Sequence, residues 1–269
     1  MEKSEVFIGV TVSSSIPGFA FAALNDEKEL LAVGQGNMKD VIAYLAGLSQ
    51  GCIAISAPQK PAMRKQTQNK KTTKKYLRSV DEIFQQHGIE VEPFGSTSQT
   101  CPAWVRHGFT FYEQVLSLGF EPFIDGEPQL RQFFETQADA VFTGLCGMKP
   151  YPAETLEGRL QRQLLLYEQD IPVADPMQFL EEITRFKILH GNLPLEQIYH
   201  PAELNALACA LTAWQSVHTP ENIHPLGTQE EGFVYLPDLP EVIAPKHQMR
   251  LPDIYPQTDL EEIVVPEKK

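Results

Sequence analysis

Residues 6–33 read VFIGVTVSSSIPGFAFAALNDEKELLAV and contain three short apolar runs separated by two turns. Residues 6–12 alternate strictly between the two sides of a strand, and residues 19–24 and 29–33 follow the turn segments SSSIPG and ND. Alternation with a period of two indicates β-strands, whereas serine, proline, glycine, asparagine and aspartate favour turns. The segment therefore predicts a three-stranded antiparallel meander.

The chain after the meander alternates between helical and strand patterns. Residues 37–48 carry apolar side chains at helical spacing, and residues 51–58 form a compact apolar run that ends at a proline. Further helices are predicted at residues 79–86, 109–118, 153–167, 177–190 and from Pro201, and further strands at residues 89–94, 130–137 and 232–236. This order predicts an α/β fold with a mixed sheet, in which parallel strands extend the meander and helices flank the sheet.

The predicted organisation is one domain over residues 1–218, with an irregular insertion at about residues 59–126. Residues 219–269 form a separate extension that contains eight prolines and ten acidic residues against four basic ones. Apart from the strand at residues 232–236, we expect this extension to be an extended tail.

Composition excludes several classes of protein. The chain has 269 residues, of which 42% are hydrophobic, so it can bury a sizeable core. The four cysteines lie far apart and form no CxxC pair, which indicates reduced core residues and not a zinc site. No stretch resembles a signal peptide or an 18-residue membrane span, so we expect a cytoplasmic protein without a membrane partner.

The net charge of −13 hides a basic segment. Residues 60–78, here called the basic window, contain eight basic residues and no acidic one, so subtracting +8 leaves −21 for the rest of the chain. One interpretation is an arm that binds nucleic acid or another polyanion. The other is a solvated loop that offsets the acidic remainder. Within the window the candidate contacts are Lys70, Lys71, Lys74 and Lys75.

Several segments resemble the domain of unknown function 429 family. The two helical ones read YPAETLEGRLQRQLLLYE at residues 151–168 and HPAELNALACALTAW at residues 200–214. The strands IGVTV and IAISAP, and FFETQADAVF followed by Lys149 and Gly158-Arg159, match in the same order. The resemblance covers about residues 6–214 and implies a ribonuclease H-like fold and a predicted nuclease that uses Mg²⁺ or Mn²⁺.

The resemblance also marks four positions at which the family carries acids, and these are Thr11, Ser56, Glu135 and Asn205 here. Only one of the four is a carboxylate. Two-metal hydrolysis needs several carboxylates around ions that lie roughly 4 Å apart. Same-face neighbours of the three neutral positions offer no acid, and a distant loop acid such as Asp125 or Asp139 stays open as a substitute.

Individual site residues also have two interpretations each. Glu135 is either a surviving weak metal ligand or the partner of Lys149 or Arg159 in a salt bridge. Lys149, Arg159 and Arg162 either contact phosphate or form a solvated face that pairs with acids such as Glu154 and Glu157.

Three functional hypotheses follow from these observations. The leading one is a ribonuclease H-like binding or regulatory module with a degenerate metal site, without a certain cofactor and with at most weak phosphodiesterase activity. The second is an active Mg²⁺- or Mn²⁺-dependent nuclease with rearranged ligands. The third is a structural protein whose acidic tail engages a protein partner.

Overall fold

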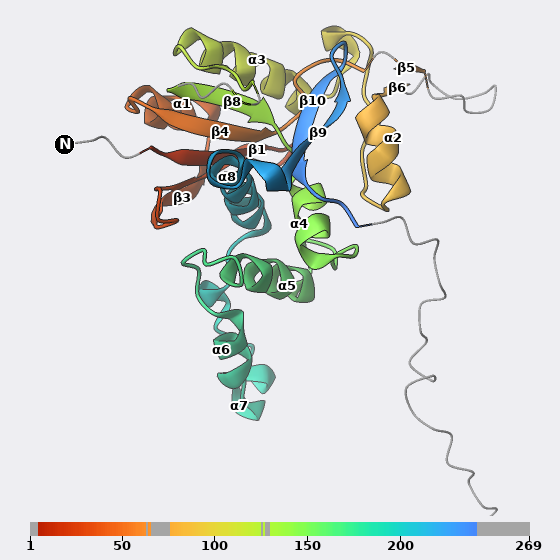
Figure 1. Ribbon diagram of the computed structural model, residues 1–269. Coiled ribbons are helices and arrows are strands. Elements are labelled where there is room, and N and C mark those ends of the chain that lie inside the picture. Colours follow the sequence, from red (N-terminus) through yellow and green to blue (C-terminus); the bar gives the residue numbers. More distant parts are fainter. Residues whose placement is uncertain (1–4, 63, 66–75, 125, 127–129, 241–269) are drawn as a thin grey trace, which may run out of the picture.

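The computed structural model describes residues 5–62, 64, 65, 76–124, 126 and 130–240. They form an α/β fold around one eight-stranded mixed sheet that is covered by helices on both faces (Figure 1). The strand order is β3-β2-β1-β4-β8-β10-β9, and the short strand β7 pairs with β8. The predicted α/β class and mixed sheet are thus confirmed.

The first three strands form the predicted antiparallel meander. β1 spans Phe7–Val12, β2 spans Phe19–Leu24 and β3 spans Leu30–Gly36. β1 and β2 are buried along almost their whole length, because helices cover both of their faces.

Parallel strands extend the meander from β1. β4 spans Gly51–Ser56 and lies beside β1, and β8 spans Arg131–Glu135 and lies beside β4. β7 (Glu121–Pro122) and β10 (Gly232–Pro237) both run parallel to β8. β9, at Ile223–Thr228, pairs antiparallel with β10 at the far edge.

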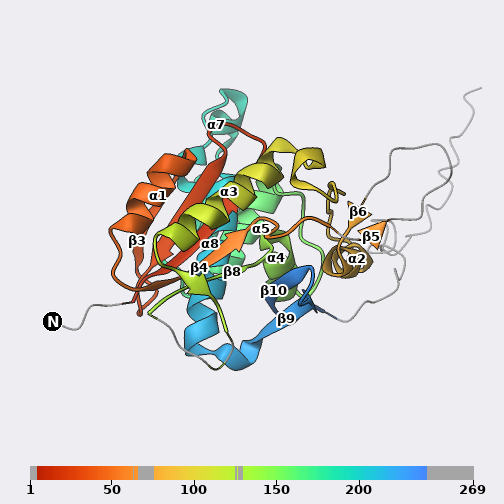
Figure 2. The same ribbon diagram turned by 90° about the horizontal axis from the view of Figure 1, so that it is seen from above.

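Two helical layers enclose the sheet (Figures 1 and 2). α1 (Met38–Ala46) and α3 (Ala103–Ser117) cover one face, and α8 (Pro201–His218) covers the other. Gly9 of β1 lets α8 approach closely, because a Cβ at this position would lie 1.9 Å from the carbonyl oxygen of Ala206. α4 (Ala138–Cys146) and α5 (Leu156–Tyr167) pack against α8 on the same side of the sheet.

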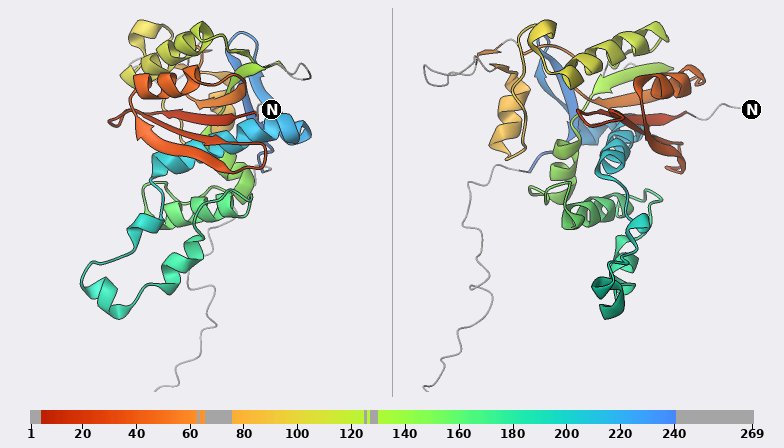
Figure 3. Two further views of the ribbon diagram at one scale, coloured as in Figure 1. Left: turned by 90° about the vertical axis from the view of Figure 1, so that its left-hand side faces the viewer. Right: turned by 180° about the vertical axis from the view of Figure 1, so that it is seen from behind.

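Shorter elements complete the fold. α2 spans Ser79–Gln86, and the small hairpin of β5 (Arg64–Lys65) and β6 (Tyr76–Leu77) precedes it. α6 (Pro176–Glu181) and α7 (Arg185–Leu189) project away from the sheet (Figure 3). The 3₁₀ turns are Ser98–Thr100, Leu195–Gln197 and Pro220–Asn222.

Two predicted elements differ from the structure. Residues 89–93 form no strand, and Pro93 lacks the N–H that a ladder needs. Residues 177–190 form two helices instead of one, because the Thr184 side chain accepts a hydrogen bond from the backbone N–H of Lys187 and starts a new helix.

The segment after α8 holds more structure than predicted. β9 was not expected, and the β9–β10 hairpin continues the main sheet beyond β8. The predicted boundary at residue 218 coincides with the end of α8, and strands before and after it belong to one sheet. Residues 241–269 of the predicted tail lie outside the described residues.

The structure shows the state of the cysteines. All four cysteines are free thiols, and Cys52, Cys101 and Cys209 are buried. Among the described residues, no helix is both long enough and apolar enough to cross a membrane.

Candidate functional site

The four positions marked by the resemblance come together at one edge of the sheet. β1, β4 and β8 are parallel, so their carboxyl ends meet there. Thr11 is the register partner of Ser56, Ile55 is the partner of Glu135, and Asn205 lies in the second turn of α8. The side of the sheet to which each side chain points then decides which of them share a site.

Thr11 and Ser56 both face α8. Gly9, two residues before Thr11, backs onto that helix, so alternation places Thr11 and its register partner on the same side. The Thr11 hydroxyl donates to the carbonyl oxygen of Ala202 at 3.5 Å. Ser56 Oγ accepts from the backbone N–H of Ala138 at 3.3 Å, so both hydroxyls serve the local backbone.

Glu135 faces the opposite side of the sheet. Its register partner Ile55 belongs to the core beneath α1 and α3. Its carboxylate is only 3% exposed and accepts hydrogen bonds from Arg78 Nη1 and from the backbone N–H of Gln59, both at 2.7 Å. The sheet separates this carboxylate from the side of Thr11 and Asn205, whereas Ser56 and Glu135 line one cavity at the strand edge.

Arg78, Asp81 and Glu135 form a buried group that we call the Arg78 cluster. Arg78 Nη2 and Nε donate to the two oxygens of Asp81 at 3.0 and 3.2 Å, and Nη1 donates to Glu135. The three side chains are at most 3% exposed. The predicted pairing of Glu135 with Lys149 or Arg159 is wrong, because its partner comes from the basic window.

The Arg78 cluster holds two carboxylates and one guanidinium in a buried place. Burial raises the pKa of Glu135, and the attraction of Arg78 and the N–H of Gln59 only partly offset this effect. Burial alone would lower the pKa of Arg78, but the charges of Glu135 and Asp81 outweigh it and raise that pKa. Arg78 therefore stays charged, and the ionised form of Glu135 is the costly one.

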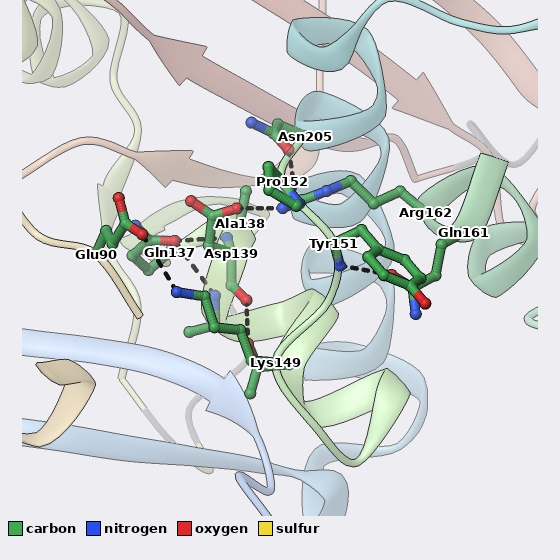
Figure 4. Close-up of polar contacts among 12 residues, drawn as sticks. Glu90, Gln137, Ala138, Asp139, Lys149, Tyr151, Pro152, Gln161, Arg162 and Asn205 are labelled. Atoms are coloured by element: carbon green, nitrogen blue, oxygen red, sulfur yellow. Dashed lines mark hydrogen bonds and ion pairs between the residues drawn. The ribbon is translucent and has the colours of Figure 1, made fainter. Parts of the chain in front are cut away.

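Asp139, Arg162 and Asn205 form a second group on the α8 side, which we call the Asp139 cluster (Figure 4). Arg162 Nη2 donates to Asp139 Oδ1 at 2.7 Å, and Nη1 donates to Asn205 Oδ1 at 3.3 Å. The Arg162 side chain is 4% exposed, whereas that of Asp139 is 42% exposed. A guanidinium thus occupies the space between the acid and the amide.

α4 positions Asp139 beside Arg162. The Gln137 side chain accepts from the backbone N–H groups of Asp139 and Ala140 and so begins the helix. The guanidinium of Arg162 also lies 4.6 Å from the ring of Phe142 in the same helix.

Arg159 has a structural role. Its Nε donates to the carbonyl oxygen of Tyr199 at 2.9 Å, and Nη2 donates to that of Ile198. Within the described ranges, Glu154 and Glu157 form no ion pair, so the predicted pairing with these acids is wrong. Since these bonds engage Arg159, it is less suited to contact a phosphate than a side chain at the surface.

Lys149 is the most accessible of the predicted phosphate contacts. It pairs with Glu90 at 3.2 Å, and the two side chains are 55% and 93% exposed. A surface pair of this kind exchanges readily with water or with another charged group.

Among the cavities that border the loop of residues 88–94, two also reach the candidate site residues. The first has a volume of about 200 Å³ and is lined by Asp139, Lys149 and Arg162, among others. The second measures about 190 Å³ and is lined by the Arg78 cluster. Glu90 borders both cavities, and Glu92 also borders the second, which therefore carries four carboxylates and one arginine.

Both ends of the basic window are fixed at the turn between β9 and β10. Lys60 Nζ donates to the carbonyl oxygen of Gln229 at 3.1 Å. The backbone N–H and hydroxyl of Ser79 donate to Glu231 Oε2 at 2.8 and 2.7 Å. The candidate contacts that lie outside the described residues are Lys70, Lys71, Lys74 and Lys75.

The residues at this edge do not fit the two-metal arrangement that the resemblance implies. In the part of the chain that the structure describes, no group of three or more His, Cys, Asp or Glu side chains lies close enough to hold an ion. Arg78 and Arg162 instead hold Glu135 and Asp139, and their positive charges oppose a divalent cation nearby.

Sequence patterns could have revealed part of this arrangement. Arg78 directly precedes the predicted helix at residues 79–86, and Asp81 is its third residue, where an acid accepts from the backbone at the helix start. Asp139 lies in the first turn of α4 and not in a loop, two residues after the Gln137 cap.

No protein-family model, curated protein or solved structure matches this chain.

Proposed function

We propose that this protein is a ribonuclease H-like module that binds a polyanion at the carboxyl edge of its sheet and does not hydrolyse it. The order of its elements supports the fold assignment: a three-stranded meander, parallel additions beside β1, and a long final helix against β1. The described topology is compatible with that fold, which the resemblance implies.

One observation supports the proposed lack of hydrolysis. The acids nearest to the edge, Glu135 and Asp139, are each paired with an arginine at 2.7 Å. A metal would have to displace the guanidinium of Arg78 from Glu135 or share Asp139 with Arg162, and the first of these pairs is almost completely buried. Displacing a buried partner is costly, because the freed charge stays uncompensated.

The basic window supplies the electrostatic side of the proposal. Its eight positive charges stand against −21 for the rest of the chain, so a polyanion is attracted here and repelled elsewhere. The window is fixed at both ends beside the β9–β10 turn, which places its anchors on the same sheet as the site. Lys149 adds an accessible cation at the rim of the first cavity.

Fluorescence anisotropy with labelled single-stranded RNA, single-stranded DNA and duplex DNA tests the binding. We expect the affinity to fall linearly with the logarithm of the salt concentration, because bound cations release counterions. Replacing Lys70, Lys71, Lys74 and Lys75 with alanine should weaken binding at least about tenfold and flatten that slope.

A charge-matched variant controls for net charge. Replacing Lys39, Lys246, Lys268 and Lys269 with alanine changes the total charge equally and should leave most of the affinity. Equal losses in both variants, or no binding by the wild-type protein, would overturn the role of the basic window.

Incubation of the same oligonucleotides with Mn²⁺ tests the lack of hydrolysis. We expect bound but intact substrate. Cleavage that is lost in Glu135→Gln or Asp139→Asn would replace this proposal with the alternative of an active nuclease that uses Mg²⁺ or Mn²⁺ through rearranged ligands.

A further inference from the structure

Residues 176–197 form a protrusion that we call the arm. It contains α6, α7 and the 3₁₀ turn Leu195–Gln197, and it follows α5 in the chain. Figure 3 shows α6 and α7 projecting away from the sheet and its helical layers. The sides of the arm are therefore accessible to solvent or to a binding partner.

The arm exposes large apolar side chains. α7 has no buried residue, although it contains Phe186, Ile188 and Leu189, which are 65%, 60% and 75% exposed. Met177 and Leu180 of α6 are 49% and 47% exposed. A monomeric protein gains little from a helix that leaves its apolar residues in water, so this surface indicates an interface.

The tip of the arm is ordered by its own contacts. The ring of Phe186 stacks on that of His190 with centroids 4.0 Å apart. The Thr184 side chain caps α7, and Lys187 pairs with Glu182 at 3.2 Å. An ordered apolar tip loses little conformational entropy when it is covered.

The size of the surface fits a dimer contact. The exposed apolar side chains of the arm together present an area on the order of several hundred Å², which exceeds the scattered exposure of an ordinary surface. With the polar side chains around them, the arm can approach the roughly 800 Å² that each partner buries in a standard interface.

Charge favours a second copy of this chain as the partner. The arm contains two basic and three acidic residues, a net −1, within a chain of −13. Because the arm carries charges of both signs, acidic residues of one copy can face basic residues of the other. An anionic lipid surface would need a surplus of basic residues, which the arm lacks.

Two side chains beside the apolar tip carry opposite charges. In the described part of the chain, neither Glu181 at the end of α6 nor Arg185 at the start of α7 forms an ion pair. A two-fold axis repeats every contact twice, so Glu181 of each copy can pair with Arg185 of the other.

We propose that two copies of this chain associate through their arms about a two-fold axis. The apolar residues of the two α7 helices meet at the centre, and the Glu181 and Arg185 pairs flank them. This dimer is independent of the polyanion proposal, because it uses none of the residues at the strand edge.

Light scattering coupled to size-exclusion chromatography tests the dimer on the full chain at protein concentrations up to about 100 µM. We expect a dimer in the wild-type protein and a monomer in Leu189→Asp. The matched control is Leu130→Asp, because Leu130 is 73% exposed but lies outside the arm, and it should stay dimeric. A monomeric wild type, dimeric Leu189→Asp or monomeric Leu130→Asp would overturn the proposal.

A charge exchange tests the two-fold arrangement. Glu181→Arg and Arg185→Glu should each raise the dissociation constant of the dimer at least about tenfold, because like charges then face each other. The variant with both substitutions should recover the wild-type constant. A double variant that is as weak as the single ones, or open-ended assemblies in the wild type, would contradict the arrangement.

Discussion

The Arg78 cluster and the Asp139 cluster contain the same arginine–carboxylate contact at 2.7 Å, but they lie on opposite sides of the sheet and differ in exposure. Arg78 and both of its acids are at most 3% exposed. Arg162 is buried as well, whereas 42% of the Asp139 side chain meets solvent at the first cavity. Contact distance alone therefore does not tell what an ion pair does.

Exposure decides what each cluster is able to do. The Arg78 cluster ties β8, the backbone of Gln59 and the start of α2 together, so it fixes the two ends of the basic window. The Asp139 cluster can exchange partners with water or with a ligand in the cavity. The Arg78 cluster therefore stabilises the fold, and the Asp139 cluster is the part of the strand edge that a ligand can reach.

Removing the guanidinium of the buried cluster should have the largest effect. Arg78→Met leaves Glu135 and Asp81 buried without a cation and should lower the free energy of unfolding by about 3–5 kcal/mol. Urea unfolding measures this loss. Combining Arg78→Met with Glu135→Leu should recover part of it, since one uncompensated charge is gone. A loss below about 1 kcal/mol would contradict the structural role.

The matching substitution in the open cluster should cost less. Arg162→Met should lower the free energy of unfolding by about 1–2 kcal/mol, because water can solvate the half-exposed Asp139 once its partner is gone. The same urea experiment compares the two variants directly. If Arg162→Met were as destabilising as Arg78→Met, exposure would not determine how much each ion pair contributes to stability.

The pH dependence of stability sharpens the description of the buried cluster. The pKa of Glu135 is raised above its usual 4.5. The contribution of this carboxyl to the free energy of unfolding is therefore fully present below pH 4.5 and is lost as the pH rises through the folded-state pKa. We expect the wild-type protein to lose stability relative to Glu135→Gln as the pH rises, by at most about 1.4 kcal/mol per pH unit. Urea unfolding of both proteins from about pH 4 to about pH 8 measures this difference. A relative gain with rising pH would mean that Arg78 lowers this pKa.

An exposed pair at the same edge should give the smallest effect. Lys149→Ala should change the free energy of unfolding by about 0–1 kcal/mol, because both Lys149 and Glu90 are largely solvated. Thermal unfolding at low and high salt checks this value. A larger loss would show that the rim of the first cavity is structural and not an accessible binding surface.

Periodicity predicted the sheet but not the grouping of the site. The meander and β4 follow from short apolar runs between turns, and these strands are present. Phe133 and Glu135 both lie on the α1–α3 side of β8, as the period of two in a strand requires. What the chain alone did not show is that Thr11 faces the other side, because the face of each strand depends on its neighbours in the sheet.

Other differences have local causes. α4 was not predicted because it starts at a Gln137 cap, an unusual capping residue, directly after a strand. β9 contains Pro225 and Gly227, which weaken a strand pattern, and it is stabilised by pairing with β10 at the sheet edge. Apart from Asp81, the partners of Arg78 and Arg162 come from distant parts of the chain, so spacing along the sequence could not reveal them.

Titration of the protein with Mn²⁺, followed by calorimetry and by the electron paramagnetic resonance of the free ion, tests the central claim most directly. That claim is that arginines hold the carboxylates at the strand edge where the sequence resemblance implies a metal site. We predict no saturable Mn²⁺ binding at this edge in the wild-type protein and no change in Glu135→Gln or Asp139→Asn. A saturable site that either substitution abolishes would contradict it.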